Sequence, residues 1–410
     1  MLKKISSTMV VMVGSMISSF AVTVILGRSL SISDFGEFAL LKQILLIGFT
    51  IAVFGLDYGY IKYFSDDHRK NKMIQFLTMK IIFGISLIFV FIIFLLYPIQ
   101  SNKLFFIFIS VCIGAINLFL AARCRIEEKF FLGQLLNSGW KIIFLILIII
   151  MTLMGQVDQL NYVYVSIPIS LAVISIFFVK KLFEKSEQID DNIDIGHYLK
   201  LGLVFWLINS SALISGGIEK FAIPLIYDSK TLGIFTGTSF LFVISLTMIG
   251  SAIGYVIFPQ IISGKIIHLW KVYLLIFIIT LSSLIIFSLF GEDIVSIMFS
   301  GRFDYYINEY LIILFTTIGS LNIVHTILHF ILSAHANEKQ LLIYWVVTLF
   351  NILVFVLFLI IMRSTSYSLL ISISIAIIIT RFLKIISILI LLKKVNNDRD
   401  GFLKIIPETV

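Results

Sequence analysis

The chain has 410 residues, of which 60% are hydrophobic and only 13% are charged, and its mean hydropathy is +1.09. Soluble domains carry about 25% charged residues, so this composition excludes a protein surrounded by water on all sides. The net charge of +8 is dispersed over short segments and forms no continuous basic patch, which excludes a nucleic-acid partner. The two cysteines are too few for a disulfide framework.

Twelve apolar runs fill the chain almost from end to end, and each is close to the roughly 20 residues that a membrane helix needs. The first run follows Lys3 and Lys4 and superficially resembles a signal peptide, but no small-residue cleavage site follows it, so we predict an uncleaved membrane helix. The predicted helices are 8–26, 35–56, 74–97, 104–122, 132–154, 162–181, 199–226, 232–261, 270–290, 308–333, 340–362 and 366–392.

Basic residues are distributed unequally between the two sets of connectors. The connectors on the side of the N-terminus hold about 20 Lys and Arg residues, and the opposite connectors hold about 6. Because basic connectors stay in the cytoplasm, we expect both termini there. The sequence therefore predicts an all-α, multi-pass protein with an even number of spans.

An acidic connector divides the chain nearly in half. We expect an N-terminal six-helix bundle at 1–183, a cytoplasmic linker at 184–197, a C-terminal six-helix bundle at 198–393 and a cytoplasmic tail at 394–410. The linker's carboxylates are typical of a solvated segment, and we assign them no chemistry.

The two predicted halves resemble each other at short motifs that occur in the same order. The pairs are Asp34-Phe35-Gly36-Glu37-Phe38 with Thr231-Leu232-Gly233-Ile234-Phe235, Gly59-Tyr60 with Gly254-Tyr255, and Glu128-Lys129 with Glu338-Lys339. Shared apolar composition alone could produce such matches. A true repeat of six helices would be parallel, with a pseudo-two-fold axis along the membrane normal, and would permit alternating access by rocking of two bundles.

A polar stripe crosses the predicted helix 132–154. Gln134, Asn137, Ser138 and Lys141 recur at three- and four-residue spacing and therefore share one helical face. The corresponding face of 340–362 carries Tyr344, Thr348 and Asn351. An aqueous cavity between the bundles would explain both stripes, and hydrogen bonds between helices are the alternative for the neutral residues.

Lys141 lies too deep for its charge to reach the headgroups, unlike Lys80, Lys200, Arg363 and Lys384, for which snorkelling is the simpler interpretation. A charge within a span is costly and usually functional. Further charges at the outer half of the membrane are candidates for a cationic vestibule: Arg28, Lys42 and the pair Glu219-Lys220.

Two histidines, His325 and His329, lie one helical turn apart in 308–333. Histidine titrates near physiological pH, so these residues and Glu219 are candidates for ion coupling, although a structural hydrogen-bonded pair is the simpler interpretation of the histidines. We expect no metal site, since no cysteine or carboxylate is placed to complete one.

The segment from Ile25 to Leu30, followed by Asp34 to Leu40, resembles the first two helices of Wzx-type polysaccharide-unit flippases. These proteins belong to the multidrug/oligosaccharidyl-lipid/polysaccharide exporter (MOP) superfamily. Arg123 and Arg125 before Phe130, and Gly233-Ile234-Phe235, add to the resemblance, which spans essentially the whole chain in length and helix count.

The resemblance implies two pseudo-symmetric six-helix bundles, as in MATE transporters, around a central cavity. It also implies a non-enzymatic protein of the bacterial inner membrane that moves undecaprenyl-pyrophosphate-linked oligosaccharides outward for O-antigen, capsule or exopolysaccharide assembly. Partners would be membrane lipids, a polysaccharide polymerase and a chain-length regulator. No cofactor is expected, and H⁺ or Na⁺ are the candidate coupling ions. A cationic cavity suits the anionic pyrophosphate, which makes Arg28, Lys42, Lys141 and Lys220 the principal candidates for binding it, with Gln134, Asn137 and Asn351 beside them.

Two other functions fit the membrane composition. A multidrug exporter of cations would favour acidic groups in the cavity, whereas bases dominate the buried charges here. A polysaccharide polymerase or acyltransferase would need a catalytic loop, and the longest outer connector, about 292–309, is short for one.

Overall fold

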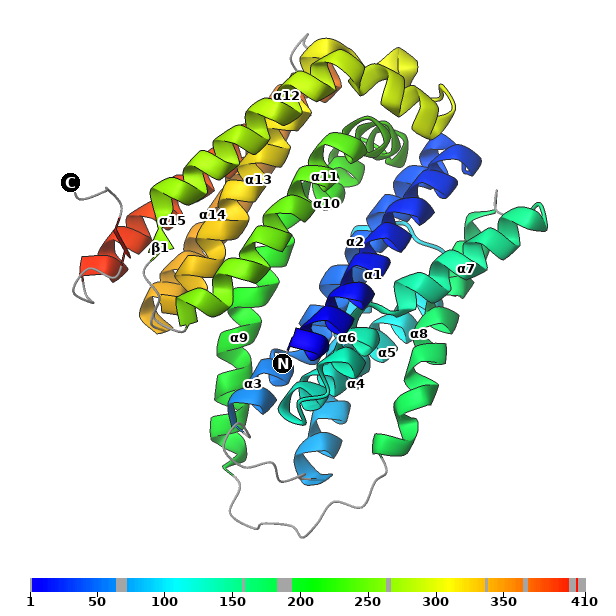
Figure 1. The fold of residues 1–410 in the computed structure, drawn as a ribbon. Helices are drawn as coiled ribbons and strands as arrows, with labels where there is room; N and C mark the ends of the chain where they lie inside the picture. The colour runs from blue at the N-terminus through cyan, green and yellow to red at the C-terminus, as the bar shows by residue number, and fades with distance from the viewer. Residues whose placement is uncertain are drawn as a thin grey trace. The chain divides into compact units, whose positions relative to one another are not determined.

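A computed structural model describes residues 2–63, 72–156, 159–182, 194–262, 267–335, 338–363, 368–397 and 403–404. The chain forms two compact units, Met1–Phe221 and Ala222–Val410. Figure 1 shows the helices of each unit. Most of the predicted linker 184–197 and of the predicted tail 394–410 lies outside the described residues.

The first unit contains nine helices and the beginning of a tenth within the described residues. They are α1 (Leu2–Ser29), α2 (Ile32–Val53), α3 (Leu56–Tyr63), α4 (Lys72–Leu96), α5 (Ser101–Ile126), α6 (Phe130–Ser138), α7 (Trp140–Leu153), α8 (Leu160–Leu182), α9 (Ile195–Gly216) and α10 (Ile218–Ile226). Helix α9 packs against α2 and α3. The compact unit therefore extends beyond the predicted linker, and the division at 184–197 stays a prediction.

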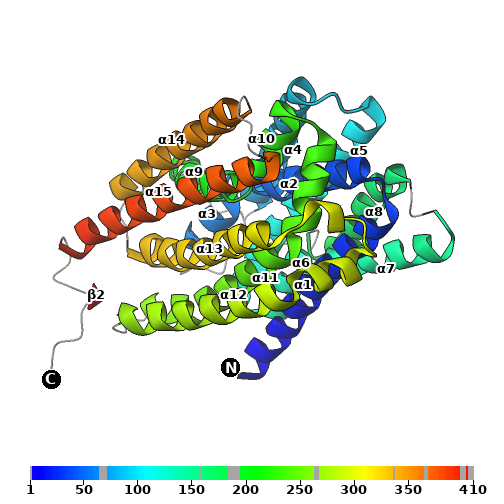
Figure 2. The same cartoon turned by 90° about the horizontal axis from the view of Figure 1, so that it is seen from above.

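The second unit is built around long helices that lie side by side in Figures 1 and 2. Its elements are β1 (Ile267–His268), β2 (Leu403–Lys404), α11 (Ser229–Ile262), α12 (Leu269–Phe299), η1 (Asp304–Tyr306), α13 (Glu309–His335), α14 (Glu338–Met362) and α15 (Leu369–Asn397). The two short strands pair in parallel. Buried aliphatic side chains of α11, α13 and α15, among them Leu246, Ile327 and Ile388, form its core.

The protein is a multi-pass membrane protein whose described residues are almost entirely helical, apart from the short strand pair. Among the described residues, ten helices are long and apolar enough to cross a bilayer, and α6 with α7 supplies an eleventh span if this bent pair counts as one. A shorter apolar stretch, Leu160–Ile176, lies in α8. The expected number of twelve spans and the cytoplasmic termini stay predictions.

Two helices that the sequence predicts as continuous, 132–154 and 199–226, are broken at 139 and 217, and the predicted helix 35–56 ends earlier, at Val53. Phe54 and Gly55 adopt positive φ values of 55° and 65°, which end α2. Helices α6 and α7 meet at Gly139 with a bend of 43°. Helix α9 ends at Gly216, and Gly217 joins it to α10. Glycine destabilises a helix interior, and at 139 and 217 the missing side chain lets the chain change direction.

The two units repeat one packing pattern. In the first unit α5 packs against α2, α4 and α8, and α7 packs against α8. In the second unit α13 packs against α11, α12 and α15, and α14 packs against α15. When the helices are counted along each half, with each broken helix counted once, these four pairs in the first half correspond to the four pairs in the second half. The helix packing therefore supports the internal repeat that short motifs indicated.

Candidate functional site

A cavity of about 380 Å³ lies within the first unit. This volume falls in the range of small-molecule sites, roughly 300–1,000 Å³. Helices α1, α2, α6 and α7 supply most of its wall, and α5, α8 and α9 contribute single apolar residues. The polar residues that line it are Ser19, Lys42, Thr50, Asn137, Ser138 and Lys141.

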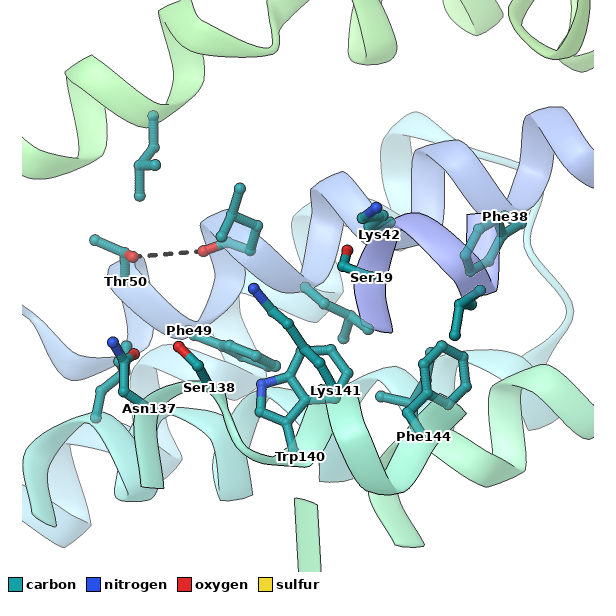
Figure 3. A pocket seen from close by; sticks show the side chains of 16 residues that line it. Ser19, Phe38, Lys42, Phe49, Thr50, Asn137, Ser138, Trp140, Lys141 and Phe144 are labelled. Atoms are coloured by element: carbon teal, nitrogen blue, oxygen red, sulfur yellow. Dashed lines mark hydrogen bonds between the residues drawn. The ribbon is translucent and has the colours of Figure 1, made fainter. Parts of the chain in front are cut away.

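Two of the predicted lysines line this cavity from different helices. Lys42 comes from the middle of α2, and Lys141 is the second residue of α7. Figure 3 shows Lys141 extending into the open space, with Lys42 and Ser19 on the wall formed by α1 and α2. The cavity wall is therefore positively charged from two sides.

A third lysine, Lys220, lies close enough to Lys42 for their charges to interact, as does Lys141. The ammonium of Lys42 donates a hydrogen bond to Thr23 Oγ1 at 3.2 Å. The ammonium of Lys220 donates to Gln43 Oε1 at 3.4 Å. Three lysines that are far apart in the sequence thus lie near one another inside a unit that spans the membrane, where ionisable side chains are costly without a function.

Lys141 owes its position to the break between α6 and α7. Because Gly139 separates the two helices, Lys141 lies in the first turn of α7, at the positive end of that helix dipole. Within the described ranges, its ammonium makes no hydrogen bond or ion pair. A positive charge at a positive helix end favours an anion nearby, so the geometry suits an anionic ligand.

The polar stripe of the sequence is partly preserved across the bend. Asn137 and Ser138, the last residues of α6, line the cavity together with Lys141. Gln134 does not line it, and its amide donates to Ser138 Oγ at 3.2 Å. Gln134 thus contacts a lining residue, and direct binding of substrate by Gln134 stays a prediction.

Four aromatic rings form part of the apolar wall, beside aliphatic side chains. Phe38, Phe49, Trp140 and Phe144 all line the cavity. The ring centroid of Trp140 lies 6.2 Å from that of Phe49 in an edge-to-face arrangement and 6.1 Å from that of Phe144. Sequence reasoning missed these rings because aromatic residues in an apolar helix are usually lipid-facing or core residues.

Gln43 is a further functional candidate that sequence reasoning missed. Its side chain is buried, and it packs against Gly217, where any Cβ would overlap the Gln43 amide. The glycine at the α9–α10 break therefore makes room for the amide that holds Lys220. A single glutamine beside Lys42 in an apolar run was the only available signal.

An ion pair joins α2, α5 and α8 near their N-terminal ends. Lys103 Nζ lies 2.8 Å from Glu37 Oε1, and the Tyr164 hydroxyl donates to the same oxygen at 2.9 Å. Both charged side chains are largely buried, with 13% and 26% of their surface exposed. Lys42 lies five residues beyond Glu37 on α2, so this cluster fixes the helix that carries one cavity lysine.

Three predicted site residues lie elsewhere. Arg28 is exposed at the end of α1 and does not line the cavity. Glu219 is the second residue of α10, next to Lys220. Asn351 belongs to the second unit, where its amide donates to the Val347 carbonyl of its own helix. Their roles in substrate binding or ion coupling stay predictions.

The two histidines belong to a buried cluster in the second unit. The rings of His325 and His329 stack with centroids 6.1 Å apart, and the Tyr344 hydroxyl lies 3.5 Å from His325 Nε2. Lys384 is only 2% exposed, with Nζ 5.6 Å from the centroid of the Tyr344 ring. Snorkelling of Lys384 is therefore wrong, because its side chain points into the packed interior of the unit.

Comparison with known proteins identifies the fold. No family model matches the chain, and no curated protein matches it. Solved structures do match over nearly the whole chain. A structure of the lipid II flippase MurJ in an inward closed conformation has a TM-score of 0.68 at 14% identity, covering 96% of this chain and 88% of its own.

Two transporters of the MATE family show the same arrangement. An inward-facing multidrug resistance MATE transporter of the MOP superfamily gives a TM-score of 0.58 at 16% identity, covering 94% of this chain and 96% of its own. The Vibrio cholerae MATE transporter VcmN in its bent form gives 0.56 at 14% identity, covering 96% and 98%. The chain therefore has the same fold as these three solved structures.

Proposed function

We propose that this protein is a flippase for undecaprenyl-pyrophosphate-linked oligosaccharides, and that the pyrophosphate binds to the cavity lysines. The observation that carries the proposal is the convergence of Lys42, Lys141 and Lys220 in the first unit. The fold shared with MurJ adds support, because that protein is named a lipid II flippase.

The physical reason is the cost of moving a pyrophosphate through an apolar medium. An isolated buried charge is strongly unfavourable, and paired charges recover part of that cost. At 4 Å, one lysine and one phosphate charge interact by about 4 kcal/mol at an effective dielectric constant near 20. Two or three such pairs offset much of the desolvation that the headgroup undergoes inside the protein.

The proposal extends to coupling and location. Alternating access needs an energy source, and we propose H⁺ or Na⁺, with His325, His329 and Glu219 as the candidate coupling residues. The protein would act in the bacterial inner membrane, beside a polysaccharide polymerase and a chain-length regulator, for O-antigen, capsule or exopolysaccharide assembly. Arg28, Gln134 and Asn351 are proposed to contact the cargo in other states of the cycle.

Multidrug export is the second candidate, because two structural neighbours are MATE transporters and the cavity has an aromatic wall. Lysines in that wall would repel a cationic drug. An anionic or neutral drug is compatible with the same charges. Measuring the cargo directly separates this function from the first.

The test is deletion of the gene in its host, followed by measurement of lipid-linked oligosaccharide in each leaflet of the inner membrane. A flippase predicts accumulation in the cytoplasmic leaflet, reversed by the wild-type gene. We expect Lys141→Met to be made at normal levels and to fail to reverse it. Lys80→Met is the matched control, because Lys80 is an exposed membrane lysine of the same unit outside the cavity.

Three results would contradict the proposal or part of it. Accumulation of single units in the outer leaflet would indicate a polymerase. An unchanged distribution together with increased drug sensitivity would indicate a multidrug exporter. Full complementation by Lys141→Met would remove Lys141 from the mechanism.

A further inference from the structure

One aromatic side chain of the cavity has an arrangement that anion binding does not require. Trp140 opens α7, directly before Lys141, and its ring is flanked by Phe49 and Phe144. It also packs against a buried cluster of the first unit that includes Leu120, Leu136 and Ile174. These contacts hold the indole in one orientation at the cavity wall.

Polar groups that can donate or accept hydrogen bonds surround this ring. Figure 3 shows Asn137 and Ser138 on one side of Trp140 and Lys141 above it. Within the described residues, the side chains of Asn137, Trp140 and Lys141 make no hydrogen bond to the protein. Polar groups in a membrane interior are costly when unsatisfied, so a ligand that satisfies them would bind favourably.

The combination of features narrows the chemistry of the ligand. A lipid chain would use the aromatic rings and leave the amide and the ammonium unsatisfied. A bare pyrophosphate would use the ammonium and leave the aromatic face unused. A pyranose attached to a phosphate matches all of them, because its C–H face packs on an aromatic ring, its hydroxyls bond amides and hydroxyls, and its phosphate pairs with a lysine.

We propose that this cavity is a specificity pocket for the first sugar of the cargo, the one bonded directly to the pyrophosphate. The sugar ring stacks on Trp140, its hydroxyls bond Asn137 and Ser138, and the adjoining phosphate pairs with Lys141. This inference rests on the proposed function. It adds that the flippase selects its cargo at the reducing-end sugar, because a cavity of about 380 Å³ is too small for a whole oligosaccharide.

The experiment measures binding to the purified full chain in lipid nanodiscs. The probes are undecaprenyl pyrophosphate and a panel of undecaprenyl-pyrophosphoryl monosaccharides carrying glucose, galactose, N-acetylglucosamine or N-acetylgalactosamine. We expect at least one monosaccharide form to bind the wild type roughly tenfold more tightly than undecaprenyl pyrophosphate does, the upper end of what one aromatic contact contributes.

Variants separate the sugar contact from the anion contact. Trp140→Ala should abolish the preference for the sugar and leave the affinity for undecaprenyl pyrophosphate within about threefold, whereas Trp140→Phe should retain part of the preference. Lys141→Met should weaken the binding of both ligands by the same factor. Trp345→Ala, a tryptophan substitution in α14 of the second unit, is the matched control and should change neither affinity.

The outcomes distinguish the two proposals. If the wild type does not bind undecaprenyl pyrophosphate, the proposed function itself fails. If it binds undecaprenyl pyrophosphate but no monosaccharide form binds more tightly, or if Trp140→Ala keeps the preference, the sugar pocket alone is refuted. If Trp140→Ala and Trp140→Phe both stay monodisperse and lose affinity for both ligands equally, Trp140 has a structural role and the inference is overturned.

Discussion

The ion pair between Glu37 and Lys103 makes a quantitative prediction about stability. Glu37→Gln removes the negative charge that pairs with Lys103 Nζ at 2.8 Å and weakens the hydrogen bond from the Tyr164 hydroxyl at 2.9 Å. It also leaves the ammonium of Lys103, which is 13% exposed, without this carboxylate. Because the cluster joins α2, α5 and α8, its loss should weaken the whole first unit.

The expected magnitude lies between two reference cases. Exposed ion pairs contribute about 0–1 kcal/mol, and removal of one partner from a fully buried pair costs about 3–5 kcal/mol. With 26% of the Glu37 side chain exposed, water can replace part of the lost interaction. We therefore expect a coupling of about 2 kcal/mol between Glu37 and Lys103, or roughly a 30-fold change in the unfolding equilibrium.

A double-mutant cycle isolates that coupling. The variants Glu37→Gln, Lys103→Met and their combination would be unfolded reversibly in mixed detergent micelles, and their free energies of unfolding compared with the wild type. The matched pair is Lys129 with Glu127, also 2.8 Å apart but with Lys129 47% exposed, for which we expect a coupling below about 1 kcal/mol. Additive effects of Glu37→Gln and Lys103→Met, within about 0.5 kcal/mol, would refute this account of the cluster.

Two further substitutions test the helix breaks and caps. Gly217→Ala should displace Gln43 and with it the ammonium of Lys220, which should weaken the binding of undecaprenyl pyrophosphate about tenfold in a titration. The control is Gly216→Ala, whose added Cβ meets open space and should change the affinity less than about twofold. Equal affinities of the two variants would exclude the Gln43 contact. Asp228 accepts the Thr231 N–H at 2.6 Å before α11, and this hydrogen bond lowers the pKa of the Asp228 carboxyl. Asp228→Ala should therefore cost about 1 kcal/mol of unfolding free energy at neutral pH. Because the pKa of Asp228 is lowered in the folded state, the difference in unfolding free energy should persist at pH values above the unfolded-state pKa near 4. It should vanish as the pH falls through the folded-state pKa. A difference that grows on acidification would contradict this role.

The sequence predicted the class of fold because its strongest signal, long apolar runs with unequal basic connectors, is a direct consequence of the membrane as solvent. The internal repeat was visible in short motifs such as Glu128-Lys129 and Glu338-Lys339 and reappears in the packing of the helices. The breaks at Gly139 and Gly217 were not predicted. A glycine in an apolar run reads as a tolerated residue unless its neighbours in space are known.

The sequence predicted only part of the cavity. Lys42 and Lys141 stand out because a charge within a span is rare, and the structure places both in the lining of one cavity. Trp140 and Gln43 gave no comparable signal, since aromatic and amide side chains occur in membrane helices for structural reasons. Their positions depend on contacts with Phe49, Phe144 and Gly217, which are distant in the sequence.

The most direct test of the account measures the affinity of the purified protein for undecaprenyl pyrophosphate in nanodiscs, before and after the cavity charges are neutralised. Truncating one partner of a buried charge pair typically costs about 2–5 kcal/mol, so the double variant Lys42→Met/Lys141→Met should bind at least a hundredfold more weakly than the wild type. The single variant Lys80→Met should bind normally. Equal affinities of the wild type and the double variant would contradict the claim that these lysines hold the pyrophosphate.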